Sequence, residues 1–214
     1  EQHSDTFLDN ASEALKNTGQ AERRDKIALF ASQISTAAID SFEGFDDLRH
    51  HVKKIRQHSL DNLDYYLSQF EKEAVHNGNQ VHFARDSEEF NSLVLDICQQ
   101  HDARRIAKGK SIVTEETSLN SFLQSAGLNV METDLGEYII QQAGETPSHI
   151  VSPALHKSAN EIRELFQQKH DLGHRELQKT SDLVAEARTV LREHFLQAEV
   201  GVIGANALIA ENGY

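Results

Sequence analysis

The sequence predicts an α/β protein in which a three-layer domain with a mostly parallel sheet follows a helical N-terminal extension. Before residue 76, apolar residues recur at three- and four-residue steps, and no segment alternates as a strand does. After residue 76, strand-like segments alternate with helices of about ten to fifteen residues, which is typical of crossovers between parallel strands. We therefore expect a helical extension over residues 1–75 and the α/β domain over residues 76–214.

The extension is predicted to be helical from about residue 4, with a break at Gly44. Its clearest feature is an apolar stripe that predicts one amphipathic helix of about six turns beside a charged remainder. The stripe comprises Leu48, Val52, Ile55, Leu63, Leu67 and Phe70. An apolar face of this length has to lie against another surface, either the following domain or a partner chain.

The α/β domain opens with a turn signal at residues 77–79. Asp86 and Ser158 are predicted helix caps, because each is followed three residues later by a glutamate. The predicted strands are 80–84, 105–109, 129–133, 149–152 and one at Val200. The predicted helices are 86–98, 119–126 closed by Gly127, 135–142, one opened by Ser158, and one through 183–195.

The segment from Val200 to Tyr214 predicts a buried strand, a glycine turn and a second strand that ends without a partner. A strand left unpaired at the end of a chain is an incomplete structure. We therefore expect the protein to continue beyond Tyr214.

Composition excludes several classes of function. The chain has 34 acidic and 21 basic residues and a formal net charge of -13, which repels nucleic acid and anionic lipid. A single cysteine, Cys98, excludes a disulfide framework and any iron-sulfur or zinc site built from several thiolates of these residues. We interpret Cys98 as a core thiol, because it continues the helical spacing of the preceding apolar residues. No apolar run approaches the ~20 residues of a membrane span, and residues 1–5 lack a signal pattern, so a cytoplasmic location is expected.

Parallel strands place their following loops at one edge of the sheet, where ligands of open α/β folds bind. The loop after the predicted strand 105–109 offers charged and hydroxyl groups there: Lys108, Lys110, Ser111, Glu115 and Glu116. Residues 109–111 read Gly-Lys-Ser, as at the end of a phosphate loop, but the required earlier glycine is missing. Either an anion contact through the lysines or a solvated loop accounts for this segment.

Two further loops reach the same edge. Asp134 is predicted to cap the following helix rather than to act in catalysis. Glu137 lies one turn later on the same side of that helix, so the spacing also allows the two carboxylates to share a cation or a substrate hydroxyl. His149 and His156 follow the predicted strand 149–152 or lie in it. The chain has 12 histidines, but their spacing does not predict a metal site.

The glycines after Val200 are compatible with a ligand approaching the backbone or with a bulge. The polar candidates of this segment are Gly204, Asn206 and Glu211.

Several blocks, in order, resemble the lactate-utilisation protein B family and its LUD domain. These blocks are 108–116, 132–140, 147–156, 185–192, and 201–206 with 210–211; the helix 61–66 and the strand 81–86 also match. The resemblance implies a Rossmann-like fold akin to the sugar-phosphate isomerase and CoA-transferase group. It also implies an iron-sulfur subunit that works with other subunits of a lactate utilisation complex, passing electrons from L-lactate to an acceptor.

In that family, 4Fe-4S clusters belong to a cysteine-rich region beyond the equivalent of Tyr214, so no cofactor is expected within these residues. Two alternatives to this function remain. One is a self-contained binder or enzyme for a small anion such as lactate or pyruvate, using Lys108, Lys110, Glu116, Asp134 and His156. The other is a scaffold whose polar loops only cap helices and cover the surface.

Overall fold

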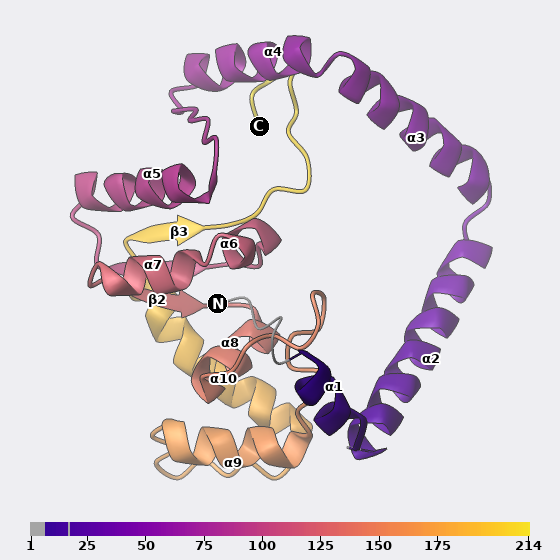
Figure 1. Cartoon of the computed structure of the whole chain (residues 1–214), viewed down its shortest axis with the longest axis vertical. Coiled ribbons are helices and arrows are strands. Elements are labelled where there is room, and N and C mark those ends of the chain that lie inside the picture. The colour runs from indigo at the N-terminus through magenta and orange to yellow at the C-terminus, as the bar shows by residue number, and fades with distance from the viewer. Residues whose placement is uncertain (1–6, 17) are drawn as a thin grey trace. The chain divides into compact units, whose positions relative to one another are not determined.

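The computed structural model describes residues 7–16 and 18–214 (Figure 1). The predicted helical start near residue 4 and the N-terminal segment 1–5 lie outside the described residues. Contacts between Cα atoms divide the chain into two compact units, with the boundary between Asp61 and Asn62.

The first unit is helical, as predicted, and consists in its described part of α1 (Phe7–Lys16), α2 (Thr18–Asp40) and α3 (Phe45–Asp61). Gly44 lies in the turn between α2 and α3 with a φ of +76°, a backbone conformation that glycine adopts without steric cost. Neither α2 nor α3 contains a buried residue. The apolar side chains of these helices are therefore open to solvent or to a partner.

The predicted six-turn helix is wrong, because the chain leaves helical geometry at Asn62 (φ -128°, ψ 36°). Asparagine and aspartate favour helix ends, since their side chains compete for backbone hydrogen bonds. The stripe is thus split between α3 and α4 (Leu63–His76). Contact clustering places α4 in the second unit, whereas the sequence analysis assigned it to the extension.

The second unit contains a parallel three-stranded sheet in the order β2-β1-β3, and its strands are β1 (Arg105–Lys108), β2 (Asn129–Glu132) and β3 (Val200–Val202). Ile106 is paired with both Val130 and Val200, so β1 is the central strand. The helices of this unit after α4 are α5 (Ser87–Gln100), α6 (Ile112–Glu116), α7 (Leu119–Ser125), α8 (Leu135–Ala143), α9 (Ala159–Lys169) and α10 (Thr180–Gln197). The predicted α/β fold class is confirmed.

Two apolar clusters lie on opposite faces of the sheet, which gives the three layers. One cluster joins β1 and β2 to α5 and α7, and it consists of Cys98, Ala103, Ile106, Leu119, Leu123 and Val130. The other joins α8, α9 and α10, and it consists of Tyr138, Ile139, Phe166, Leu177, Leu183, Ala187 and Leu191. Val130 belongs to the first cluster while its neighbour Met131 packs against the second, because successive strand residues face opposite sides. In Figure 1, α5 lies on one side of the strands and α9 on the other. Burial raises the pKa of the Cys98 thiol, as expected for a core cysteine.

Three predicted strands are absent from the described chain. Residues 80–84 are irregular, and Phe83 is 59% exposed, because no neighbouring strand pairs with them. In the segment 149–152, the backbone amides of Val151 and Ser152 donate to Nδ1 of His149, so a local side chain takes the hydrogen bonds that a sheet would need. The predicted last strand is also wrong.

The segment after β3 instead turns back against α4. Asn77 donates a side-chain hydrogen bond of 2.7 Å to the Asn212 carbonyl. Gly213 has a φ of +72°, and a Cβ there would lie 2.3 Å from the Ala74 amide nitrogen. Only a glycine fits this close approach without strain.

Candidate functional site

The carboxyl ends of β1 and β2 carry the densest group of buried charges in the described residues. β1 ends at Lys108 and β2 ends at Glu132, and both side chains are buried. α6 begins just after β1 with Ser111 as its cap, and α8 begins just after β2 with Asp134 as its cap. These short connections bring the helix starts to the strand ends, where the sequence predicted the ligand edge.

Lys108 is completely buried rather than part of a solvated loop. Its ammonium nitrogen lies 2.7 Å from Oε1 of Glu115 on α6 and 2.7 Å from Oε1 of Glu132. Burial alone would lower the pKa of Lys108, but the hydrogen bonds and charges of the two carboxylates raise it above its usual value. Lys108 therefore stays charged and joins α6 to both strands, and its donors are directed at protein carboxylates rather than at a ligand.

Glu137, in the first turn of α8, is a buried carboxyl group beside that of Glu132. The residue is 7% exposed, and the two carboxyl groups share a hydrogen bond, while Oε2 of each receives no donor from another described residue. Burial, together with the charges of Glu132 and Asp134 and the hydrogen bond to Glu132, raises the pKa of Glu137 to about 7, and Lys108 offsets only part of this effect. Near neutral pH the carboxyl group is thus poised to gain or lose a proton.

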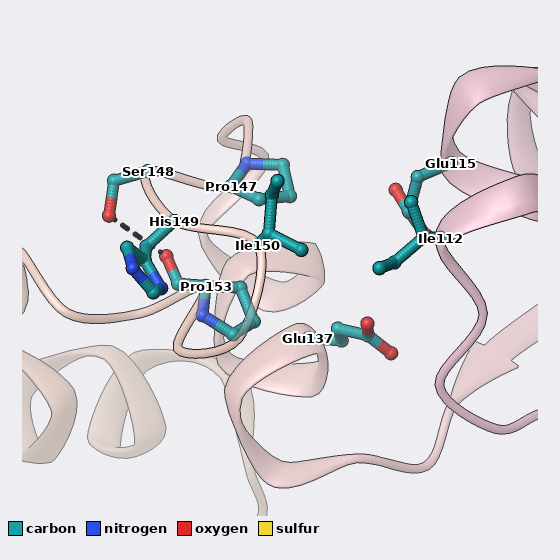
Figure 2. A pocket seen from close by; sticks show the side chains of 8 residues that line it. All are labelled: Ile112, Glu115, Glu137, Pro147, Ser148, His149, Ile150 and Pro153. Carbon is teal, nitrogen blue, oxygen red and sulfur yellow. Dashed lines mark hydrogen bonds between the residues drawn. The ribbon is translucent and has the colours of Figure 1, made fainter. Parts of the chain in front are cut away.

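Glu137 forms part of the wall of a cavity of about 220 Å³ (Figure 2). The full lining is Ile112, Glu115, Glu137, Pro147, Ser148, His149, Ile150 and Pro153. Figure 2 shows Glu137 and the two α6 residues bordering the space opposite the loop 147–153, while the His149 ring lies on the other side of Pro153. The cavity is therefore bordered by α6, α8 and the loop 147–153 and is partly open to solvent.

Several predicted site residues instead stabilise local structure at this edge. The Asp134 carboxylate accepts hydrogen bonds from the Gly136 and Glu137 amides, which confirms the predicted cap. Ser111 caps α6, a short helix that the sequence analysis had interpreted as loop. Lys110 donates to the Val151 carbonyl at 2.9 Å, and its ammonium nitrogen lies 3.9 Å from Asp134.

The remaining candidates are dispersed. Gly204 packs against the strand-end loop, because a Cβ there would lie 3.1 Å from the Lys110 carbonyl oxygen. Glu116 is exposed on α6, and Asn206 and Glu211 are exposed on the segment after β3. The structure therefore does not bring Asn206 and Glu211 into polar contact with the described edge.

His149 and His156 lie in the loop between α8 and α9 and organise it. Nδ1 of His149 accepts two backbone amides, and His156 contacts the Ser148 hydroxyl at 2.7 Å and Glu145 at 2.8 Å. Hydrogen bonds from Lys157 and His156 lower the pKa of Glu145. Both histidines thus fix the loop that closes the cavity.

A second cavity, of about 320 Å³, lies on the α10 side of the β2 end. Its lining consists of Thr133, Leu135, Val184, Ala187, Arg188, Leu191, Arg192 and Phe195. The charged residues of this lining are Arg188 and Arg192, so its charge is positive. The two arginines lie one helical turn apart on α10. The sequence analysis included these arginines in the block 185–192 that carries the family resemblance but did not propose them as site residues, although their spacing of four residues was a usable signal.

The described residues contain no arrangement suited to a metal ion, and the sequence has too few cysteines for a cluster. Its one cysteine lies in the core, whereas iron-sulfur clusters need several thiolates. Within residues 7–16 and 18–214, no group of three or more His, Cys, Asp or Glu side chains is arranged to hold a metal ion. The described helices include none that is both long and apolar enough to cross a bilayer.

Comparison with known proteins gives consistent similarities. Residues 67–214 match the LUD domain family. The chain is 45% identical over 177 residues to lactate utilization protein B of Bacillus velezensis, which covers 82% of this chain and 37% of that protein. It is 44% identical over 194 residues to the protein of the same name from Geobacillus sp. (strain WCH70), covering 89% and 40%, and 38% identical over 213 residues to that of Bacillus subtilis, covering 98% and 43%. The chain thus spans about two fifths of the length of these relatives. No solved structure matches it.

Proposed function

The chain belongs to the LUD domain family, and from this premise we propose that it is the LUD portion of a bacterial protein for lactate utilisation. The observation that carries the proposal is the identity of 38% to 45% with three relatives named lactate utilization protein B. Identity at this level extends over most of the chain. It is therefore not limited to a short motif that unrelated proteins share.

In its finer form, the proposal is that the intact protein is an iron-sulfur subunit in the oxidation of L-lactate to pyruvate. That reaction releases two electrons and two protons, and 4Fe-4S clusters elsewhere in the protein supply the electron transfer. The residues described here do not fit such a cluster, so their part in the proposal is to position substrate and to contact other subunits. The proposal retains the cytoplasmic location expected from the sequence, and cell fractionation tests it.

The cavity beside α10 is the part of this chain that suits a small carboxylate. Two guanidinium groups four residues apart offer paired donors to one carboxylate. Neither Arg188 nor Arg192 has a described ion pair with an acidic side chain. Leu191 and Phe195 provide an apolar surface for the methyl group of lactate or pyruvate.

The test is growth on L-lactate of a strain that lacks the gene and carries the intact gene or a variant. We expect the deletion strain to fail on L-lactate and grow on pyruvate. The double variant Arg188→Gln/Arg192→Gln should grow poorly on L-lactate, while the exposed α3 variant Arg56→Gln should grow normally. Normal growth of the deletion strain on L-lactate would contradict the proposed role. Normal growth of the double variant alone would contradict only the carboxylate site.

The exposed apolar side chains of α3 suit contact with other subunits of a lactate utilisation complex. Leu48, Val52 and Ile55 are all exposed and lie at helical spacing on one face. In a pull-down from cells that produce the intact protein, Val52→Asp/Ile55→Asp should lose partners that Lys54→Asp retains. Equal recovery of partners by both variants would contradict this docking role.

A further inference from the structure

We propose that Ser148, His156 and Glu145 act together as nucleophile, base and acid in the hydrolysis of short-chain carboxylic esters. The three residues lie in the loop between α8 and α9. Two of them belong to the block 147–156, which the sequence analysis singled out and the role in lactate utilisation does not use. The inference stands apart from that role. It rests on the contacts among the three side chains and on the exposure of the serine.

The imidazole of His156 links the other two side chains. Its Nδ1 lies 2.7 Å from the Ser148 hydroxyl oxygen, and its Nε2 lies 2.8 Å from Oε2 of Glu145. A serine is activated for attack when a base lies within about 2.6–3.2 Å and a third group orients that base. Both contacts meet this condition. The arrangement differs from the familiar serine triad in which ring nitrogen faces the serine.

The Glu145 carboxylate determines which ring nitrogen accepts the serine proton. Hydrogen bonds from Lys157 and His156 lower the pKa of Glu145, so this carboxylate is ionised at neutral pH and only accepts hydrogen bonds. Nε2 of neutral His156 therefore carries the hydrogen, and Nδ1 carries the lone pair. The Ser148 hydroxyl then donates to Nδ1 at 2.7 Å rather than to the Pro153 carbonyl at 3.1 Å. In this state the histidine is placed to act as a general base.

The serine is accessible to substrate, and free amide donors follow it in the chain. Ser148 is exposed, and in Figure 2 its side chain points away from Glu137, so a short ester reaches the hydroxyl directly from solvent. The backbone amides of His149 and Ile150 donate no hydrogen bond to another described residue. In serine hydrolases the amide that follows the nucleophile receives the developing oxyanion. The amide of His149 has this position.

The reaction is an acyl transfer to the serine followed by hydrolysis. Oγ of Ser148 attacks the ester carbonyl carbon while Nδ1 of His156 takes the hydroxyl proton. The bond from that carbon to the leaving oxygen then breaks, and Nδ1 gives the proton to this oxygen, which departs as an alcohol. A water molecule attacks the acyl group and loses a proton to Nδ1, and the serine oxygen leaves and recovers that proton. One ester and one water become one acid and one alcohol.

The experiment measures hydrolysis of p-nitrophenyl acetate by the purified intact protein. We expect saturable turnover by the wild type. Ser148→Ala and His156→Gln should each lower kcat/KM by about 10²-fold or more. Ser125→Ala is the matched control and should equal the wild type, because its exposed hydroxyl donates to the Phe122 carbonyl and contacts no histidine among the described residues.

Glu145 is a positioning residue, because it acts on the substrate only through His156. Glu145→Gln keeps the size of the side chain and removes the charge that stabilises the imidazolium formed during attack. This variant should lower kcat by about tenfold or more and leave KM unchanged. A side chain that only supports the loop would not produce this separation of kcat from KM.

Covalent labelling of the wild type gives a readout that does not depend on a variant folding. An activated serine displaces fluoride from a fluorophosphonate probe and becomes phosphonylated, and mass spectrometry of the peptides should locate the adduct on Ser148. Protein unfolded in urea should not be labelled. The proposal is overturned if Ser148→Ala hydrolyses p-nitrophenyl acetate as fast as the wild type, or if the folded protein is not phosphonylated at Ser148. The three side chains would then serve only to hold the loop.

Discussion

Replacement of Lys108 by methionine should cost the second unit a large part of its stability. The side chain is 0% exposed and contacts Glu132, which is itself 3% exposed. Within the described residues, Lys108 is the one cation paired with Glu132, so the variant leaves a carboxylate buried without a counter-charge. Removing one partner of a buried ion pair costs about 3–5 kcal/mol.

The second partner of Lys108 contributes much less to this loss. The side chain of Glu115 is 39% exposed, so water solvates it once the lysine is gone, and exposed pairs are worth about 0.2–1 kcal/mol. The expected decrease in the free energy of unfolding is therefore about 3–5 kcal/mol and comes mainly from Glu132. Lys108→Met/Glu132→Gln should recover much of the loss, because no unpaired charge remains buried.

Urea denaturation followed by circular dichroism at neutral pH measures these free energies. Lys110→Met is the matched control, since its side chain is 35% exposed and lies 3.9 Å from Asp134, so its loss should stay under about 1 kcal/mol. The reasoning would be refuted by a Lys108→Met loss no larger than that of Lys110→Met. A double variant as unstable as Lys108→Met alone would also refute it.

Three further predictions concern single residues. The folded-state pKa of Glu137 lies at about 7 rather than 4.5, so the free energy of unfolding should fall by about 3 kcal/mol as the pH rises from 4.5 to 7. Urea denaturation of Glu137→Gln at several pH values should lack this dependence on pH. Backbone and side-chain hydrogen bonds lower the pKa of Glu199 to about 2, so its stabilising contribution is present above pH 4.5 and lost as pH falls toward 2; acid denaturation of Glu199→Gln should be flatter over this range. Gly213→Ala should release the C-terminal segment from Ala74 and speed its amide hydrogen exchange, whereas Gly201→Ala, with nothing within 4 Å of its Cβ, should not.

Helix signals in this sequence are local, and they predicted the structure well. Asp86, Asp134 and Ser158 cap helices as expected, because a cap needs only its own side chain and the amides of the next turn. The box between Ser158 and Glu161 is formed in both directions. The division at Asn62 was missed, since the apolar stripe continues across it, and the short helix α6 was interpreted as loop.

Strands depend on partners that can be distant in sequence, so the local alternation of apolar and polar residues was insufficient to predict them. The alternation in residues 80–84 is as clear as that in 105–108, yet only the latter meets a neighbouring strand. The segment 149–152 has strand-forming residues, but the side chain of His149 takes its amides. No local rule separates these cases.

The candidate functional site could also be predicted only in part, because its side chains come from segments that are distant in sequence. Lys108 was interpreted as a cation of the loop that follows the strand, whereas its burial depends on carboxylates 7 and 24 residues farther along the chain. The sequence did predict that Glu137 lies at the ligand edge. Its raised pKa depends on burial beside the Glu132 carboxyl group, and composition and spacing do not specify how closely β2 and α8 bring the two together.

The order of strands in the sheet has a consequence for how the protein folds. β1 pairs with β2 across 24 residues, measured between Lys108 and Glu132, but with β3 across 94 residues, measured between Ile106 and Val200. Closing the longer loop costs about 1 kcal/mol more in chain entropy, since each doubling adds about 0.6 kcal/mol. We therefore expect the parallel β1–β2 pair, with the crossover helices α6 and α7, to form in the folding nucleus and β3 to join after the rate-limiting step. In kinetic terms, substitutions in β2 should slow refolding, whereas loss of the Glu199 contacts should mainly accelerate unfolding.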